Sequence, residues 1–246
     1  MSAAPDGAST FGALTSEDVA RLDAAALECG VSTLQLMEIA GWQVARCAWR
    51  RIGNRPSDIA VIAGYGNNGG DGLVAARHLA TWGCTVTATV VADETRVQGI
   101  INDHVRSARA CGVDVTITAD AGAVQSRAAS ASLIIDAILG TGLRSAPRDP
   151  QAGVIRVVNG SGRPTLSVDV PSGLDATSGE AFDPCVRATL TCTLTAMKRG
   201  LRGGDASACA GEIWIADIGM PAAAWARAGL HHPPGVVAGE LVHTSS

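Results

Sequence analysis

The chain has 246 residues, of which 47% are hydrophobic and only 3% aromatic, so it is long enough for one α/β domain with a core of Ala, Val, Leu and Ile. A net charge of −4 without a basic stripe gives no electrostatic reason to expect nucleic-acid binding. No apolar run reaches membrane-spanning length, so a membrane partner is not expected.

The cysteines and histidines carry no metal-binding or disulfide pattern. Seven cysteines are scattered without any Cys-x-x-Cys spacing, which favours reduced thiols and a cytoplasmic location. The five histidines lack metal-ligand spacing, so a transition-metal site is not expected.

Two helices are predicted near the start of the chain. Residues 1–14 are rich in Ala, Ser, Gly and Pro and indicate a disordered lead rather than a signal peptide. Amphipathic helices are expected over residues 16–29 and 32–52, and Pro56 ends the second. One domain is expected over residues 15–228. After Pro221 we expect a short helix, with a loose tail over residues 229–246.

Short apolar runs alternate with longer stretches through the rest of the chain. Five of them are separated by stretches long enough for crossover helices, which predicts a three-layer, doubly wound, mainly parallel sheet of the Rossmann-like kind. Two more runs extend the edge of that sheet. The predicted strands cover residues 59–63, 86–91, 113–117, 133–135, 166–168, 190–194 and 213–215.

The most informative segment is residues 64–72, Gly-Tyr-Gly-Asn-Asn-Gly-Gly-Asp-Gly, between the first predicted strand and a helical pattern. Glycines let a ligand approach the main chain, and the free N–H groups of a helix start attract anions, so a phosphate or diphosphate is expected there. A nucleoside-triphosphatase loop is excluded because no Lys-Ser or Lys-Thr follows. The alternatives are a plain glycine turn with Asp71 as helix N-cap, or a dinucleotide fingerprint with Asp93 as its ribose acid.

Three predicted turns leave strands at the same edge of the sheet, after residues 63, 135 and 168. Ligands of open α/β sheets bind beyond this edge, so one cleft is expected to receive all three turns. Asp136 and Asp169 directly follow apolar residues, and we expect both carboxyls to be partly desolvated at the rim of the core.

The glycine segment, followed by Val-Ala-Ala-Arg-His-Leu at 74–79, resembles the NAD(P)H-hydrate epimerase family, the YjeF N-terminal type. Further blocks that match this family lie at residues 136–143, 167–173, 195–200 and 216–221. The resemblance runs from about Leu14 to about Pro221. It implies a three-layer Rossmann-like fold with two N-terminal helices.

The resemblance also implies an activity. Family members are isomerases that interconvert the R and S forms of hydrated NADH and NADPH (NADHX and NADPHX), which implies a separate NAD(P)HX dehydratase as pathway partner and a homodimer. It further implies a potassium ion held by Asn68, Asp136 and Ser172. Lys198 is added to the implied substrate contacts because it is the only lysine in the chain. These contacts are Asn67, Asn68, Gly69, Gly70, Asp71, Gly140, Thr141, Gly142, Leu143, Arg144, Ser145, Ala146, Asp169 and Lys198.

Asp169 is the residue expected to perform the chemistry. Inverting the hydroxyl-bearing ring carbon requires breaking and remaking a bond, and one carboxyl beside the ring can serve as acid and then as base. The alternative for Asp169 is a strand-end turn former. Arg144 either pairs with a phosphate or faces solvent, and Lys198 is either a site residue or a strand-end cation.

Two departures from the family pattern and two rival functions remain. Met197 and Tyr65 stand where prolines are usual, which puts the positions of Lys198 and the phosphate loop in question. An NAD-dependent dehydrogenase does not need the paired asparagines, and a catalytically silent scaffold has no chemical reason to keep Asn68, Asp136, Asp169 and Ser172 together. Trp42 and Trp49 either cover the sheet or form a dimer contact.

Overall fold

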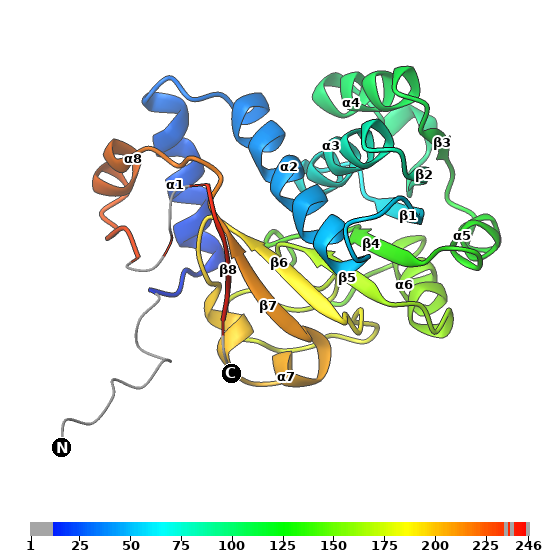
Figure 1. Cartoon of the computed structure of the whole chain (residues 1–246). Helices are drawn as coiled ribbons and strands as arrows, with labels where there is room; N and C mark the ends of the chain where they lie inside the picture. Colours follow the sequence, from blue (N-terminus) through cyan, green and yellow to red (C-terminus); the bar gives the residue numbers. More distant parts are fainter. Residues whose placement is uncertain (1–11, 234–235, 237–238, 245–246) are drawn as a thin grey trace.

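A single eight-stranded sheet organises the chain in the computed structural model, which describes residues 12–233, 236 and 239–244 (Figure 1). Its order is β3-β2-β1-β4-β5-β6-β7-β8, and every neighbouring pair is parallel except β7 with β8. The strands are β1 Asp58–Ala63, β2 Thr85–Val90, β3 Asp114–Ile117, β4 Leu133–Ala137, β5 Thr165–Val168, β6 Leu190–Leu194, β7 Glu212–Ala216 and β8 Leu241–His243.

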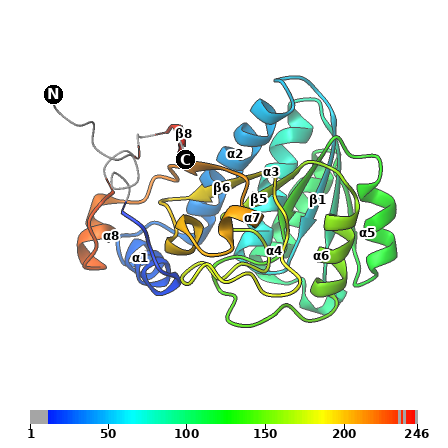
Figure 2. The same ribbon diagram turned by 90° about the horizontal axis from the view of Figure 1, so that it is seen from below.

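Helices cover both faces of the sheet, which confirms the predicted three layers. One apolar cluster joins one face to α2, α3 and α4, and a second cluster joins the other face to α5 and α6 (Figure 2). The helices are α1 Ser16–Glu28, α2 Thr33–Arg51, α3 Asn67–Thr81, α4 Gly99–Ala110, α5 Ala121–Ala128, α6 Gln151–Gly160, α7 Ala206–Cys209 and α8 Ala222–Arg227, with 3-10 turns η2 Glu94–Arg96 and η3 Arg199–Arg202.

The two N-terminal helices begin at capping boxes. Thr15 caps α1 with Asp18, and Ser32 caps α2 with Gln35, each pair satisfying two otherwise free N–H groups. Both helices end one residue before the predicted boundary. The expected helix pair is therefore confirmed.

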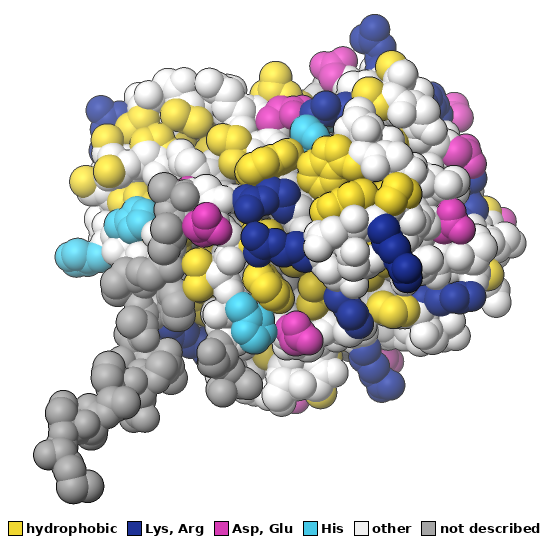
Figure 3. Space-filling model, in the orientation of Figure 1, with side chains coloured by type: hydrophobic (Ala, Val, Ile, Leu, Met, Phe, Trp, Pro, Cys, Tyr) yellow, Lys and Arg dark blue, Asp and Glu magenta, His cyan; other side chains and the backbone are white. Residues whose placement is uncertain are grey.

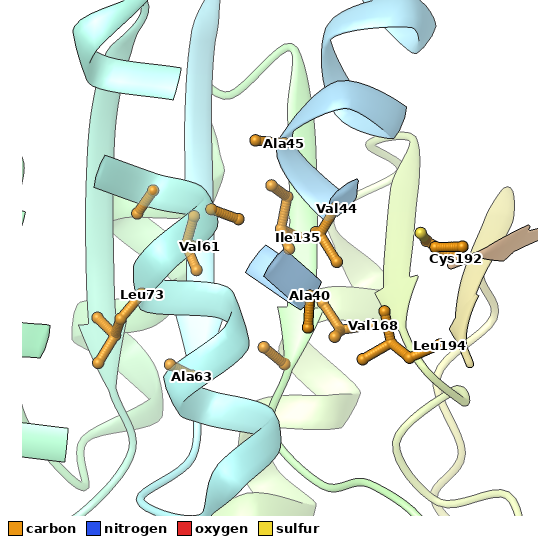
Figure 4. Close-up of a cluster of buried hydrophobic side chains, with 14 of the residues drawn as sticks. Ala40, Val44, Ala45, Val61, Ala63, Leu73, Ile135, Val168, Cys192 and Leu194 are labelled. Carbon is orange, nitrogen blue, oxygen red and sulfur yellow. The ribbon is translucent and has the colours of Figure 1, made fainter. Parts of the chain in front are cut away.

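The core between α2, α3 and the sheet is built from small and branched residues. Figure 4 shows Val44 of α2 and Leu73 of α3 over Val61 and Ile135 of neighbouring strands, and all four side chains are fully buried. A Cβ on Gly41 of α2 would lie 2.4 Å from the Val74 Cβ, so glycine is what allows α2 to approach α3 this closely.

The structure corrects the predicted loose tail and shows that the connection after β5 is irregular. No helix connects β5 to β6, because residues 169–189 form an irregular stretch interrupted by Pro171, Pro184 and Gly173, which is buried with φ +108°. The predicted loose tail contains β8, which pairs with β7 and buries Leu241. Of the predicted lead, residues 1–11 lie outside the described part.

Leu14 ends the lead and belongs to the folded domain. Its N–H donates to the Met197 carbonyl at 2.8 Å, and its own carbonyl accepts from Arg199 N–H at 2.8 Å. This isolated parallel bridge fixes the start of α1 beside the segment that follows β6.

Candidate active site

A cleft of about 620 Å³ opens beyond the carboxyl ends of the central strands. The strand order reverses between β1 and β4, and ligands of open α/β sheets bind at such a switch point. The turns after β1, β4, β5 and β6 all contribute to its wall, as predicted for the first three. Helices α1 and α2 also line the cleft.

The glycine turn places α3 with its start toward the cleft. Gly66 is the N-cap of α3, and Asn67, Asn68 and Asp71 line the cleft. The alternative in which Asp71 caps the helix is wrong, since Asp71 lies within α3 and is buried. A Cβ on Gly69 would lie 1.9 Å from the Gly64 carbonyl oxygen, so only glycine fits the turn.

Not every predicted substrate contact reaches the cleft wall. Gly69 and Gly70 are buried behind it, and Ser145 and Ala146 are exposed outside it. The remaining predicted contacts line the cleft: Asn67, Asn68, Asp71, Gly140, Thr141, Gly142, Leu143, Arg144, Asp169 and Lys198.

Arg144 lies on the second turn with its guanidinium facing the turn's own backbone. It donates to the carbonyl oxygens of Thr141 at 2.8 Å and Leu143 at 3.0 Å. These bonds hold the arginine over the turn while its side chain stays exposed. A cation is thereby held at the cleft wall.

Asp169 and Lys198 form a buried ion pair in the cleft. Asp169 follows β5 with φ +68°, and its Oδ1 accepts from the Lys198 ammonium and from Leu194 N–H at 3.0 Å. Lys198 is 1% exposed and also donates to the Leu194 carbonyl at 2.5 Å. The only lysine of the chain is therefore held against the carboxyl that was expected to perform the chemistry.

Asp136 lies deeper than predicted, with its carboxyl fully buried inside β4 rather than at the rim. Burial raises its pKa, against hydrogen bonds from Ser172 and Ser167 at 2.6 to 2.9 Å. Ser172 Oγ also lies 3.2 Å from the Leu139 carbonyl oxygen, to which Asn68 donates at 3.1 Å.

This oxygen cluster surrounds the buried Asp136 carboxylate. Among the described residues no ion pair involves Asp136. Carboxylate, hydroxyl, amide and carbonyl oxygens are hard ligands suited to an alkali cation, and such an ion would compensate the buried charge.

Helix α1 adds a carboxyl that the sequence reasoning missed. Asp23 lines the cleft, and burial together with the charge of Asp169 raises its pKa to about 6, while Lys198 opposes the shift. Burial, Asp169 and Asp23 raise the pKa of Asp71 well above its usual value. No sequence motif marks Asp23, because an acidic residue on an amphipathic helix is most simply assigned to the solvent face.

Tyr65 and Met197, which replace family prolines, are both anchored. Tyr65 lines the cleft, and its hydroxyl accepts from Arg96 at 2.9 Å. The Met197 carbonyl accepts from Leu14 N–H. Asp93 only precedes η2 and does not line the cleft, which weakens the dehydrogenase alternative.

Comparisons with known proteins give a consistent family. The protein-family model described as YjeF-related protein N-terminus (YjeF_N) matches residues 33–200. The crystal structure of yeast ynu0 (YNL200c) superposes with a TM-score of 0.80 at 25% identity, covering 95% of this chain and 100% of the yeast chain.

Curated relatives are of two lengths. The "NAD(P)H-hydrate epimerase" of Pirellula staleyi is 36% identical over 197 residues, covering 79% of this chain and 86% of the relative. The "Bifunctional NAD(P)H-hydrate repair enzyme Nnr" of Hyperthermus butylicus is 42% identical over 216 residues, covering 85% of this chain. The chain spans only 38% of the length of that bifunctional relative.

Proposed function

The chain belongs to the YjeF-related protein N-terminus family, and on that premise we propose that it is an isomerase, an NAD(P)H-hydrate epimerase. It interconverts the R and S forms of NADHX and NADPHX, in which water has added to the nicotinamide ring. Relatives that carry the epimerase name match most of their own length to this chain.

One observation carries the proposal: the Asp169–Lys198 pair lies in the same cleft as the anion-binding start of α3. The free N–H groups at that start suit a diphosphate. A dinucleotide bound there reaches from the glycine turn across to a charged carboxyl, as an acid–base reaction on its ring requires.

Different residues of the cleft bind the substrate and carry out the chemistry. Asn67, Asn68 and the α3 start orient the diphosphate, and Arg144 supplies a positive charge beside it. Helices α1 and α2 line the cleft as well and limit the access of bulk water. Asp169 accepts the proton of the water that adds to the ring carbon, and Lys198 keeps that carboxylate in place.

We further propose a potassium ion at the oxygen cluster, held by Asn68, Asp136 and Ser172. When bound, it supplies positive charge that compensates the buried Asp136 and lowers the charge repulsion between this carboxylate and a bound diphosphate. The support is the set of converging hard oxygens around a carboxylate without a basic partner among the described residues.

The setting of the reaction is also proposed. A dehydratase activity consumes the epimer, as the name of the bifunctional repair enzyme among the relatives suggests. All seven cysteines are free, which suits a reducing cytoplasm. Among the described helices none is long and apolar enough to cross a membrane.

The test of the proposed function uses a purified hydrate epimer that a stereospecific dehydratase does not accept. Adding the native protein is expected to accelerate NADH recovery, and Asp169→Ala to lower kcat by roughly 10² to 10⁴ fold, the usual contribution of an acid–base group. The surface substitution Asp103→Ala serves as control, since Asp103 lies on α4 outside the cleft. No acceleration by the native protein would favour the scaffold, and full activity of Asp169→Ala would remove Asp169 from its role.

A further inference from the structure

The leaving hydroxyl needs a proton donor other than the Asp169 carboxylate, which is the proton acceptor of the reaction. Asp169 Oδ1 already accepts hydrogen bonds from Lys198 and from Leu194 N–H. A carboxylate held by an ammonium is suited to accept a proton rather than to donate one. A second acidic group facing the same space would complete an acid–base pair.

We infer that Asp23 of α1 is this second acid–base residue, acting across the cleft from Asp169. The inference rests on the proposed epimerase function. It assigns chemistry to a residue that lies outside every motif of the chain, on helix α1, which lines the same cleft as the end of β5.

The position of Asp23 is fixed by the anchoring of α1. The bridge of Leu14 to the segment after β6 and the bond from Ser16 N–H to Thr177 Oγ1, 2.9 Å long, hold the start of the helix. Val19 and Asp23, one helical turn apart, both line the cleft. Asp23 therefore lines the same cleft as Asp169, and among the described residues the two carboxyls share no hydrogen bond.

The charged groups around Asp23 suit a proton donor. Asp169 and Lys198 face it from the ends of β5 and β6, and Asp71 acts on it from α3. From α8, which packs on α1, Arg227 donates to Cys29 Sγ at 3.4 Å. Within the described part of the chain the Asp23 carboxyl has no ion pair, so burial and Asp169 leave its pKa at about 6.

Asp71 is the weaker candidate for the same role. Burial, Asp169 and Asp23 raise its pKa well above the usual value, and its carboxyl is more enclosed than that of Asp23. Asp71 is only 8% exposed, whereas Asp23 is open to the cleft. A catalytic acid works best when its pKa lies near the working pH.

The proposed epimerisation needs no oxidant or reductant. Protonated Asp23 donates to the hydroxyl on the ring carbon, the C–O bond breaks and water leaves, while the ring nitrogen lone pair forms a C=N⁺ bond. Water then adds to the other face, the C–O bond forms again, and Asp169 accepts the released proton. The reverse epimerisation, or exchange with solvent, returns the proton to Asp23.

Asp23→Asn tests this assignment, with Glu17→Gln as control on an exposed position of the same helix. Asp23→Asn is expected to lower kcat by on the order of 10² fold or more with little change in KM. In the native protein and the control, kcat/KM for either epimer is expected to fall as the pH rises through about 6. Asp23→Asn is expected to lose this decrease. Asp23→Glu, which keeps a carboxyl, is expected to restore part of kcat and the decrease of kcat/KM with rising pH.

The outcomes are distinguishable. The assignment would be overturned if Asp23→Asn kept the native kcat, kept the decrease of kcat/KM with rising pH, or raised only KM. None of these results would contradict the proposed epimerase function. A native protein without epimerase activity would overturn the proposed function as well.

Folding of the variant is checked through its stability, which needs no substrate. The raised pKa of Asp23 means that the native state binds a proton more tightly than the unfolded state, so ionisation destabilises the native state as pH rises from about 4 to about 6. Asp23→Asn is therefore expected to unfold at higher urea than the native protein at pH 8, with the difference absent below about pH 4. Equal unfolding midpoints at pH 8 would contradict the raised pKa and count against the assignment.

Discussion

An uncommon backbone conformation sets the direction of the Asp169 side chain. Its φ of +68° is costly for a residue with a Cβ, on the order of 1 to 3 kcal/mol, and such strain gathers at functional sites. Thr195, which follows the neighbouring strand β6, has φ +67°. Both residues line the cleft. The left-handed turn lets Asp169 N–H continue the ladder to the Cys192 carbonyl while the carboxyl meets Lys198.

The Asp169–Lys198 pair makes a prediction about stability. Lys198→Met leaves a buried carboxylate without its cation and is expected to cost roughly 3 to 5 kcal/mol of unfolding free energy. Adding Asp169→Asn to this variant is expected to recover most of the loss. Urea unfolding at pH 7 measures both.

The control for this prediction is a pair on the surface. Arg21→Met breaks the Arg21–Asp18 pair, whose arginine side chain is 50% exposed, and is expected to cost at most about 1 kcal/mol. A Lys198→Met cost as small as that of the control would show that the buried pair is not needed for stability.

At the scale of elements, the glycines at the start of α3 are expected to differ in how much they contribute to stability. Gly69→Ala would place a Cβ 1.9 Å from the Gly64 carbonyl oxygen, so overpacking is expected to cost at least about 1 to 3 kcal/mol and to displace the anion-binding turn. The Cβ added by Gly66→Ala would have no atom within 4 Å. This variant is expected to lose less than about 1 kcal/mol of stability, because alanine is a poorer N-cap residue than glycine. Urea unfolding of the two variants should rank them in this order, and equal stabilities would contradict the close approach.

The elements differ in how far they could be predicted. Every predicted strand and both opening helices are present, because apolar runs and capping residues are local signals. β8 was missed because three residues in a Pro- and Gly-rich tail carry no periodicity, and only the free edge of β7 makes them a strand.

At the scale of the whole molecule, the proposed potassium ion links three separated segments: α3, the end of β4 and the turn after β5. An ion that binds only the folded protein stabilises it, by about 2.7 kcal/mol at a hundred times its dissociation constant. We expect a higher melting temperature in potassium chloride than in tetramethylammonium chloride at equal ionic strength. Asp136→Asn should lose this difference, and a native protein that melts identically in both salts would argue against the ion.

The surface over α2 bears on the homodimer that the family resemblance implies. Trp49 contacts Trp82 edge to face at a ring distance of 5.8 Å and so covers the fold, whereas Trp42 is 39% exposed beneath Arg46. Figure 3 shows hydrophobic and basic side chains side by side where α2 runs in Figure 1. Aromatic and arginine side chains are enriched in interfaces.

Sedimentation velocity tests the homodimer. The native chain is expected to sediment as a dimer, and Trp42→Asp to shift the population toward monomer by placing a charge in the contact. Glu17→Gln, on an exposed position of α1, should leave the dimer unchanged. A native chain that is monomeric at micromolar concentration would contradict the proposal.

The sequence by itself determined the sheet, the opening helices and the turns that meet at its edge, because these depend on periodicity, capping residues and glycine, which act over a few neighbours. Only the tertiary structure decided that Lys198 pairs with Asp169, that Asp136 is buried inside β4, and that Asp23 faces the cleft. These three facts depend on contacts between residues that are far apart in the chain. Such contacts set burial and charge environment, and no local pattern records them.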